Sequence, residues 1–95
     1  MEAFIFNNIT AAAPTTSVLR RGQGILHSIT INKAAINGVI TVYDGIDATG
    51  TLIGTITSPA TLLANQNTLI YDVCFNKGLT IVTSTTAQDI TVSYK

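Results

Sequence analysis

The chain has 95 residues, with five basic and five acidic side chains and a formal net charge of zero. This length fits a single domain, and the absence of a basic majority excludes an ordinary nucleic-acid-binding protein, which would carry a basic face. Charged residues make up only 11% of the chain, so a free monomer would be poorly protected against self-association. The single cysteine, Cys74, rules out an intramolecular disulfide.

The composition favours strands over helices. The sequence contains 16 Thr, 13 Ile and 6 Val, and these β-branched side chains fit the pleated surface of a sheet. Good helix formers are scarce, with one Glu, three Lys and one Met. No basic region precedes a long apolar core, and no stretch approaches the ~20 apolar residues that cross a bilayer. We therefore expect an all-β protein without a signal peptide or a membrane span.

The first 17 residues differ from the rest of the chain. A short apolar patch, Phe4 to Phe6, precedes a stretch of small residues that Pro14 interrupts. We interpret residues 1–17 as an N-terminal arm and linker, and residues 18–95 as a β-sandwich domain. The alternative is that the patch forms a first strand of the sandwich, because short apolar runs do not distinguish the two.

Residues 25–32 alternate with a period of two, which predicts a strand. In this register His27 shares a face with Ile25, Ile29 and Ile31, so we expect its side chain to point into the core or into a subunit contact. The dipeptide Asn37-Gly38 tolerates the positive φ angles of a type I′ turn. It predicts a hairpin that leads into a strand over residues 39–43.

The remaining elements follow at regular intervals. Turn-forming residues predict a loop over 44–50 and a turn over 76–78. Further strands are predicted at residues 52–57, 69–75, 79–83 and 90–94. This makes six strands, or eight if residues 4–9 and 17–21 are strands too. Spacing of 8–12 residues and short loops indicate a small antiparallel β-sandwich, jelly-roll-like, with six to eight strands.

Few residues suggest chemistry. Asp44 and Asp47 resemble a calcium loop only distantly, because the spaced acidic series of such a loop is missing, and we interpret them as turn residues. Asp72 is predicted to face outward and to discourage wrong strand pairing, and Cys74 to behave as a small hydrophobic residue. His27 has no catalytic partner near it in sequence. We expect no catalytic residues, no metal and no cofactor, and hence no enzyme.

The chain from Gly24 to Tyr94, about three quarters of its length, resembles a family of small tailed-bacteriophage virion proteins of the head-decoration or capsid-cement type. The segments that carry the resemblance are residues 24–32, 38–44, 50–53, 69–73, 78–83 and 89–94. Residues 1–17 lie outside it.

The resemblance implies a structural virion protein that binds the outside of a bacteriophage capsid and stabilises contacts between major capsid subunits. It implies a homo-oligomer, with a trimer as the first expectation, made in the host cytoplasm and located on the capsid surface. Its partners would be the major capsid protein and further copies of itself, with no nucleic acid or membrane. The alternative function is a receptor- or glycan-binding β-sandwich module of a head fibre or tail.

Five residues are candidates for partner contacts. Phe4, Ile5 and Phe6 are candidate anchors, because buried aromatic residues dominate the energetics of many interfaces. Arg20 and Arg21 form the only doubled basic site. They could meet an acidic partner surface and accelerate association in a salt-sensitive way, or they could simply be a solvated turn.

Overall fold

Eight antiparallel strands account for most of the residues that the computed structural model describes, namely 4–10, 15–33, 38–57, 67–84 and 88–95. No helix occurs within these ranges, and so none there is long and apolar enough to cross a membrane. The strands are β1 (Ile5–Ile9), β2 (Thr15–Arg21), β3 (Gly24–Lys33), β4 (Val39–Asp44), β5 (Thr51–Thr57), β6 (Asn67–Phe75), β7 (Gly78–Ser84) and β8 (Asp89–Tyr94).

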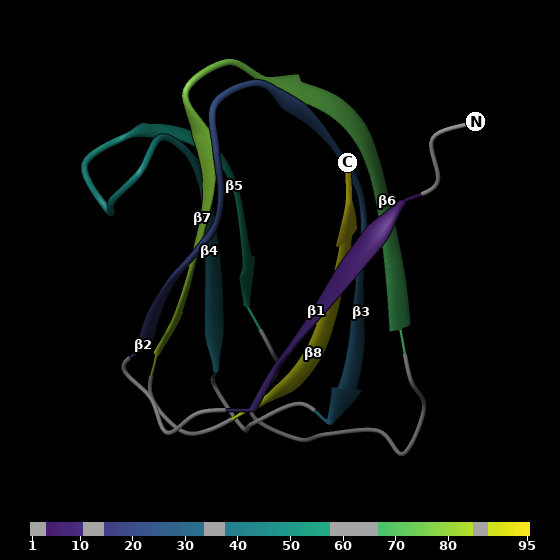
Figure 1. Cartoon of the computed structure of the whole chain (residues 1–95). Helices are drawn as coiled ribbons and strands as arrows, with labels where there is room; N and C mark the ends of the chain where they lie inside the picture. The colour runs from purple at the N-terminus through teal and green to yellow at the C-terminus, as the bar shows by residue number, and fades with distance from the viewer. Residues whose placement is uncertain (1–3, 11–14, 34–37, 58–66, 85–87) are drawn as a thin grey trace.

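The strands form two four-stranded sheets that face each other (Figure 1). Sheet A has the order β1-β8-β3-β6 and sheet B the order β2-β7-β4-β5. The first strand therefore pairs with the last, the second with the seventh, the third with the sixth and the fourth with the fifth. A long hairpin rolled up on itself gives this pairing, which is that of an eight-stranded jelly roll. The predicted fold class is confirmed.

The core lies between the two sheets and is almost entirely aliphatic. Ile40, Ile90 and Val92 are fully buried, because alternation within their strands directs them to the inner face, and Leu26 and Ile29 of β3 are fully buried beside them. The other buried apolar residues are Ile9, Ile31, Val42, Phe75, Leu79, Ile81 and Tyr94.

A β-bulge in β3 changes the register that the sequence predicted. Leu26 is opposite Tyr94 and Ser28 is opposite Ser93, so β3 has one more residue than β8 at His27. The extra residue reverses the alternation. Leu26 and Ile29 consequently both face the core. Of the two positions predicted for His27, the core is wrong, and a subunit contact stays a prediction.

Two further predictions are corrected by the strand pairing. Residues 5–9 are not an arm outside the sandwich, because β1 pairs with β8 along its whole length, and Thr15 already belongs to β2. The alternative of a first strand is the one observed. The strands on either side of Asn37-Gly38 do not form a hairpin, because β3 lies in sheet A and β4 in sheet B. Asn37 itself lies outside the described residues.

Three connections meet at one end of the sandwich, which we call the turn end. They are the turn between β2 and β3, the loop between β4 and β5 and the turn between β6 and β7, at the upper end of Figure 1. Backbone hydrogen bonds tie them together: the Gly22 amide donates to the Lys77 carbonyl at 2.9 Å and the Gly45 amide donates to the Gly78 carbonyl at 3.1 Å. These hydrogen bonds therefore hold the three connections of the turn end together.

Candidate functional site

The outer face of sheet A carries two rows of side chains that run across all four strands. Register places Phe6, Ser93, Ser28 and Ile70 in one row, and Asn8, Thr91, Thr30 and Thr68 in the next. Directly paired residues project from the same face of a sheet, and the 3.1 Å contact between the Thr30 and Thr68 hydroxyls shows this. The centre of this face is uncharged and rich in hydroxyl groups.

Large apolar side chains are exposed on both edge strands of sheet A. On β1, Phe6 has 71% of its surface exposed, and on β6 Ile70 has 62%. Ile5 is also mostly exposed, and Phe4, just before β1, is exposed to 41%. Grouped apolar side chains on a surface indicate a binding role, and Phe4 and Phe6 are such a pair at the β1 edge, whereas Ile70 lies on the opposite edge of the sheet. Of the predicted anchors, Phe4 and Phe6 contribute to this outer face, whereas Ile5 alternates to the other side of β1.

A network of amides anchors β1 to its neighbours at the far end of this face. The Asn8 side-chain amide donates to the Asp89 carboxylate at 2.6 Å and to the Ile90 carbonyl at 3.0 Å. From β3, the Asn32 amide donates to the same carboxylate at 3.1 Å and to the Thr91 hydroxyl at 3.0 Å. Asp89 is therefore an acceptor shared by two strands, which helps to hold the edge strand in place.

At the turn end, Phe4 contacts His27 of β3 and Lys95, the residue after β8. Its ring stacks on His27 with the ring centroids 4.3 Å apart, and the Lys95 ammonium lies 4.9 Å from the Phe4 centroid. The His27 Nδ1 atom is 2.5 Å from the Asp72 carboxylate. Asp72 has a positive φ of 49°, a conformation that aspartate adopts more readily than most residues. His27 thus lies on the outer face, where the bulge brings it to a carboxylate 45 residues away.

The two arginines have different surroundings. The Arg20 Nε–H donates to the Gln23 carbonyl at 2.7 Å, and Arg20 lines a pocket that also includes Lys95. Arg21 is exposed and does not line this pocket. Since Lys95 also contacts Phe4, the structure brings Phe4 and Arg20 to the turn end, where Arg21 also lies at the end of β2 but outside the pocket.

Asp44 and Asp47 stabilise loops, as the sequence predicted for turn residues. The Asp44 carboxylate accepts backbone N–H bonds from Asn76 at 3.0 Å and Lys77 at 2.8 Å, with a longer one from Gly78. These bonds hold the pKa of Asp44 below its ordinary value of 3.8, with the Lys77 amide contributing most. The Asp47 carboxylate accepts from the Thr49 hydroxyl and amide, which lowers its pKa too. Both acids are engaged within the turn end.

Replacing Asp44 with asparagine is expected to change how stability depends on pH. Because the folded pKa is lowered, the carboxylate's contribution is complete above pH 3.8 and disappears as the pH falls through the lower folded value. We expect Asp44→Asn to cost about 1 kcal/mol at pH 7, a small value because solvent screens this site. The difference from the unsubstituted protein should vanish in strong acid. Urea denaturation between pH 7 and pH 2 measures it, and a difference that persists in acid would contradict the assignment.

Cys74, which was predicted to behave as a small hydrophobic residue, is exposed on β6. Asp72 is exposed as predicted and is bound to His27. Within the described ranges no three His, Cys, Asp or Glu side chains are grouped so that they could hold a metal ion. The His27–Asp72 pair and Cys74 therefore do not form a ligand cluster.

Sequence reasoning missed the hydroxyl rows and Ile70. Their only signal was the alternation of Ser and Thr with apolar residues in β3, β6 and β8, which shows that one face is polar but not which strands are neighbours. No family model, curated protein or solved structure matches this chain. The function is therefore inferred from the geometry of the site.

Proposed function

We propose that the chain is a structural virion protein that binds the outside of a bacteriophage capsid, as a decoration or cement protein, through the outer face of sheet A. The observation that carries this proposal is the pair of exposed apolar side chains, Phe6 and Ile70, that flank an uncharged row of hydroxyl groups. A face with apolar side chains at its edges and an uncharged centre suits docking onto another protein surface. The major capsid protein is the partner that the family resemblance implies.

The character of the face supports protein binding. Typical interfaces combine a few aromatic or aliphatic anchors with a polar rim that excludes water. Here Phe6 and Ile70 would be the anchors, while the amides of Asn8 and Asn32 and the carboxylate of Asp89 form a rim at one end. Many identical sites on a capsid would convert a modest affinity for each copy into a high avidity for an oligomer.

Self-association belongs to the same proposal. The net charge of zero leaves little repulsion between copies, so we expect a homo-oligomer in solution, with the trimer suggested by the family resemblance alone. Light scattering after size exclusion measures the mass. A stable species of 10.0 kDa at micromolar concentration would count against this part of the proposal.

The capsid-binding test uses point variants, because deleting residues 1–17 would remove β1 and part of β2. The double variant Phe6→Thr/Ile70→Thr is compared with Val18→Thr/Leu52→Thr, whose apolar side chains are exposed on sheet B. Threonine preserves strand propensity in both. Each protein is added to undecorated capsids of the virus that encodes it, and co-sedimentation and the temperature of capsid disruption are measured.

The unsubstituted protein and the sheet B variant should co-sediment and raise the disruption temperature. The sheet A variant should bind at least about 30-fold more weakly, since losing an interface hot spot costs about 2 kcal/mol or more. Equal binding by both variants would remove sheet A as the docking face. If the unsubstituted protein does not bind capsids, the decoration proposal fails and the fibre or tail module becomes the better candidate.

A further inference from the structure

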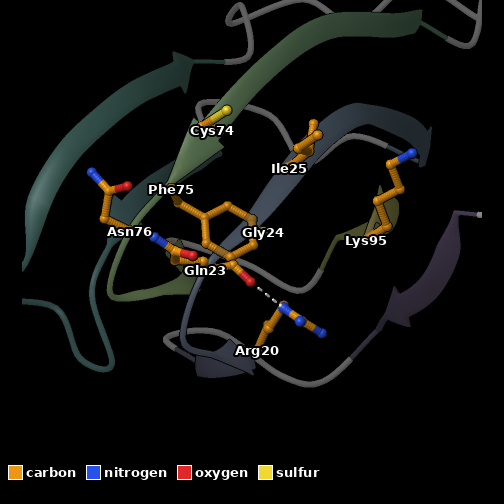
Figure 2. Close-up of a pocket in the computed structure, with 8 residues that line it drawn as sticks. All are labelled: Arg20, Gln23, Gly24, Ile25, Cys74, Phe75, Asn76 and Lys95. Atoms are coloured by element: carbon orange, nitrogen blue, oxygen red, sulfur yellow. Dashed lines mark hydrogen bonds between the residues drawn. The ribbon is translucent and has the colours of Figure 1, made fainter. Parts of the chain in front are cut away.

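A pocket opens at the turn end, away from the hydroxyl rows of sheet A. It has a volume of about 370 Å³ and lies where the β2–β3 turn, the end of β6 and the residue after β8 come together. Figure 2 shows the Phe75 ring among the lining residues, with Cys74 and Asn76 to one side of it and Arg20 and Lys95 to the other. The lining residues are Arg20, Gln23, Gly24, Ile25, Cys74, Phe75, Asn76 and Lys95.

The ionisable side chains that line this pocket include two basic ones and no acidic one. The basic ones are Arg20 and Lys95. Within the described ranges neither Arg20 nor Lys95 forms a salt bridge with an Asp or Glu side chain. Gln23 and Asn76 add side-chain amides that can donate hydrogen bonds. The pocket therefore offers several donors and positive charge to an anionic group.

The pocket is also held in shape before any ligand arrives. The Arg20 Nε–H donates a hydrogen bond to the Gln23 carbonyl at 2.7 Å. This bond orients the guanidinium and leaves its terminal nitrogens to donate to a ligand. Ile25 and Lys95 exchange two backbone hydrogen bonds of 2.7 and 2.9 Å. Gly24 has no side chain, and this lets the Phe75 ring and the Lys95 carbonyl approach its Cα. Such preorganisation lowers the entropic cost of binding.

We propose that this pocket binds a carboxylate carried on a small, partly apolar body. The planar fork of an arginine matches a carboxylate in two parallel hydrogen bonds, whereas lysine acts as a point charge. Ile25, Phe75 and Cys74 supply the less polar part of the lining. The carboxylate could belong to a free acidic small molecule, such as an acidic sugar, or to a glutamate side chain of a partner. This inference is independent of capsid binding, because Phe6 and Ile70 do not line the pocket.

The test is a titration of ¹⁵N-labelled protein followed by NMR. N-acetylneuraminic acid represents an acidic sugar and N-acetylglutamate amide an acidic side chain. N-acetylglutamine amide is the uncharged control of nearly the same shape, and inorganic phosphate tests whether any anion suffices. We expect saturable chemical-shift changes at the amides of Gln23, Cys74 and Asn76 with at least one of the two carboxylates. The compound that binds more tightly identifies which of the two sources supplies the carboxylate. The glutamine compound should produce no saturable shifts.

Charge-matched variants locate the binding. Arg20→Gln and Lys95→Gln should each lower the affinity for the carboxylate compound by about tenfold, because each variant loses a charge-assisted hydrogen bond. Arg21→Gln removes the same charge one residue away, outside the pocket, and should change the affinity less than about twofold. The proposal is overturned if Arg21→Gln has the same effect as Arg20→Gln, if neither carboxylate saturates, or if phosphate or the glutamine compound binds as tightly as the carboxylates.

Discussion

Replacing Gly24 with alanine is expected to lower the free energy of unfolding by about 3 kcal/mol, at the upper end of the cost of overpacking a core. A Cβ atom at this position would lie 2.5 Å from the Lys95 carbonyl oxygen and 2.5 Å from Cζ of Phe75. The carbonyl belongs to the backbone pair between Ile25 and Lys95, so it cannot move without breaking that pair. The Phe75 ring is only 1% exposed, so moving it would disturb the residues that pack around it.

Gly22→Ala is the matched control. Gly22 has a φ of +96° and nothing within 4 Å of the position of its Cβ. Alanine there is strained by the backbone conformation alone, at a cost of about 1 kcal/mol. Both substitutions remove the same flexibility from the unfolded chain, and the difference between them in urea denaturation therefore isolates the clash. Equal losses for the two variants would show that Gly24 is not a close-contact position.

A double-mutant cycle separates the two clashes at Gly24. Phe75→Leu removes the Cζ atom and, on its own, leaves a small cavity. In combination with Gly24→Ala it relieves the contact with the ring. The double variant should therefore lose less free energy of unfolding than the sum of the losses in the two single variants. Coupling energies between residues in contact reach about 0.5–3 kcal/mol. An additive result would assign the whole cost to the Lys95 carbonyl.

The strands could be predicted from the sequence because their signal is local. Thr, Ile and Val recur at alternate positions from residue 25 onward, and this alternation predicted β4, β5, β7 and β8 close to their observed bounds. The residues between them are turn formers. The first two strands, β1 and β2, were available only as the alternative strands at residues 4–9 and 17–21. Such patterns predict the fold class, because only a few sandwich architectures are compatible with this number and spacing of strands.

The pairing partners could not be predicted, because they depend on distant parts of the chain. Asn37-Gly38 carries a local hairpin signal, yet β3 pairs with β6 and β8, and β4 pairs with β5 and β7. In a jelly roll the chain crosses from one sheet to the other at this point. The local turn preference is compatible with either outcome, and only the packing of the two sheets decides between them.

The bulge at His27 explains why the candidate site was only partly predicted. Every residue from 25 to 32 is acceptable in a strand, so nothing marks the position where one residue is added. That addition moves Leu26 inward and places His27 beside Asp72 and Phe4. The sequence does not show that Phe6 shares a row with Ser93, Ser28 and Ile70. That alignment depends on the register between the strands.

The hydroxyl of Tyr94 joins the two sheets, and its removal is the second large effect that we expect. Tyr94 belongs to β8 in sheet A and is 3% exposed. Its hydroxyl donates to the Leu19 carbonyl of β2 in sheet B at 3.1 Å and accepts from the Asn7 side-chain amide of β1 at 2.6 Å. Tyr94→Phe would leave a carbonyl and an amide without these partners, and unsatisfied buried groups cost about 1–3 kcal/mol each.

We therefore expect Tyr94→Phe to lower the free energy of unfolding by about 2 kcal/mol, because the half-buried Asn7 amide can recover part of its loss from water. Tyr43→Phe is the control, since the hydroxyl of Tyr43 has no hydrogen bond to the described residues, and it should cost less than about 0.5 kcal/mol. Hydrogen exchange adds a local measurement: the β1 amides should exchange faster in Tyr94→Phe, because β1 contacts the sandwich mainly through β8. If the two tyrosine variants are equally stable and β1 exchanges unchanged, the hydroxyl does not join the sheets, and the Asn8 network with Asp89 is what holds the proposed docking strand.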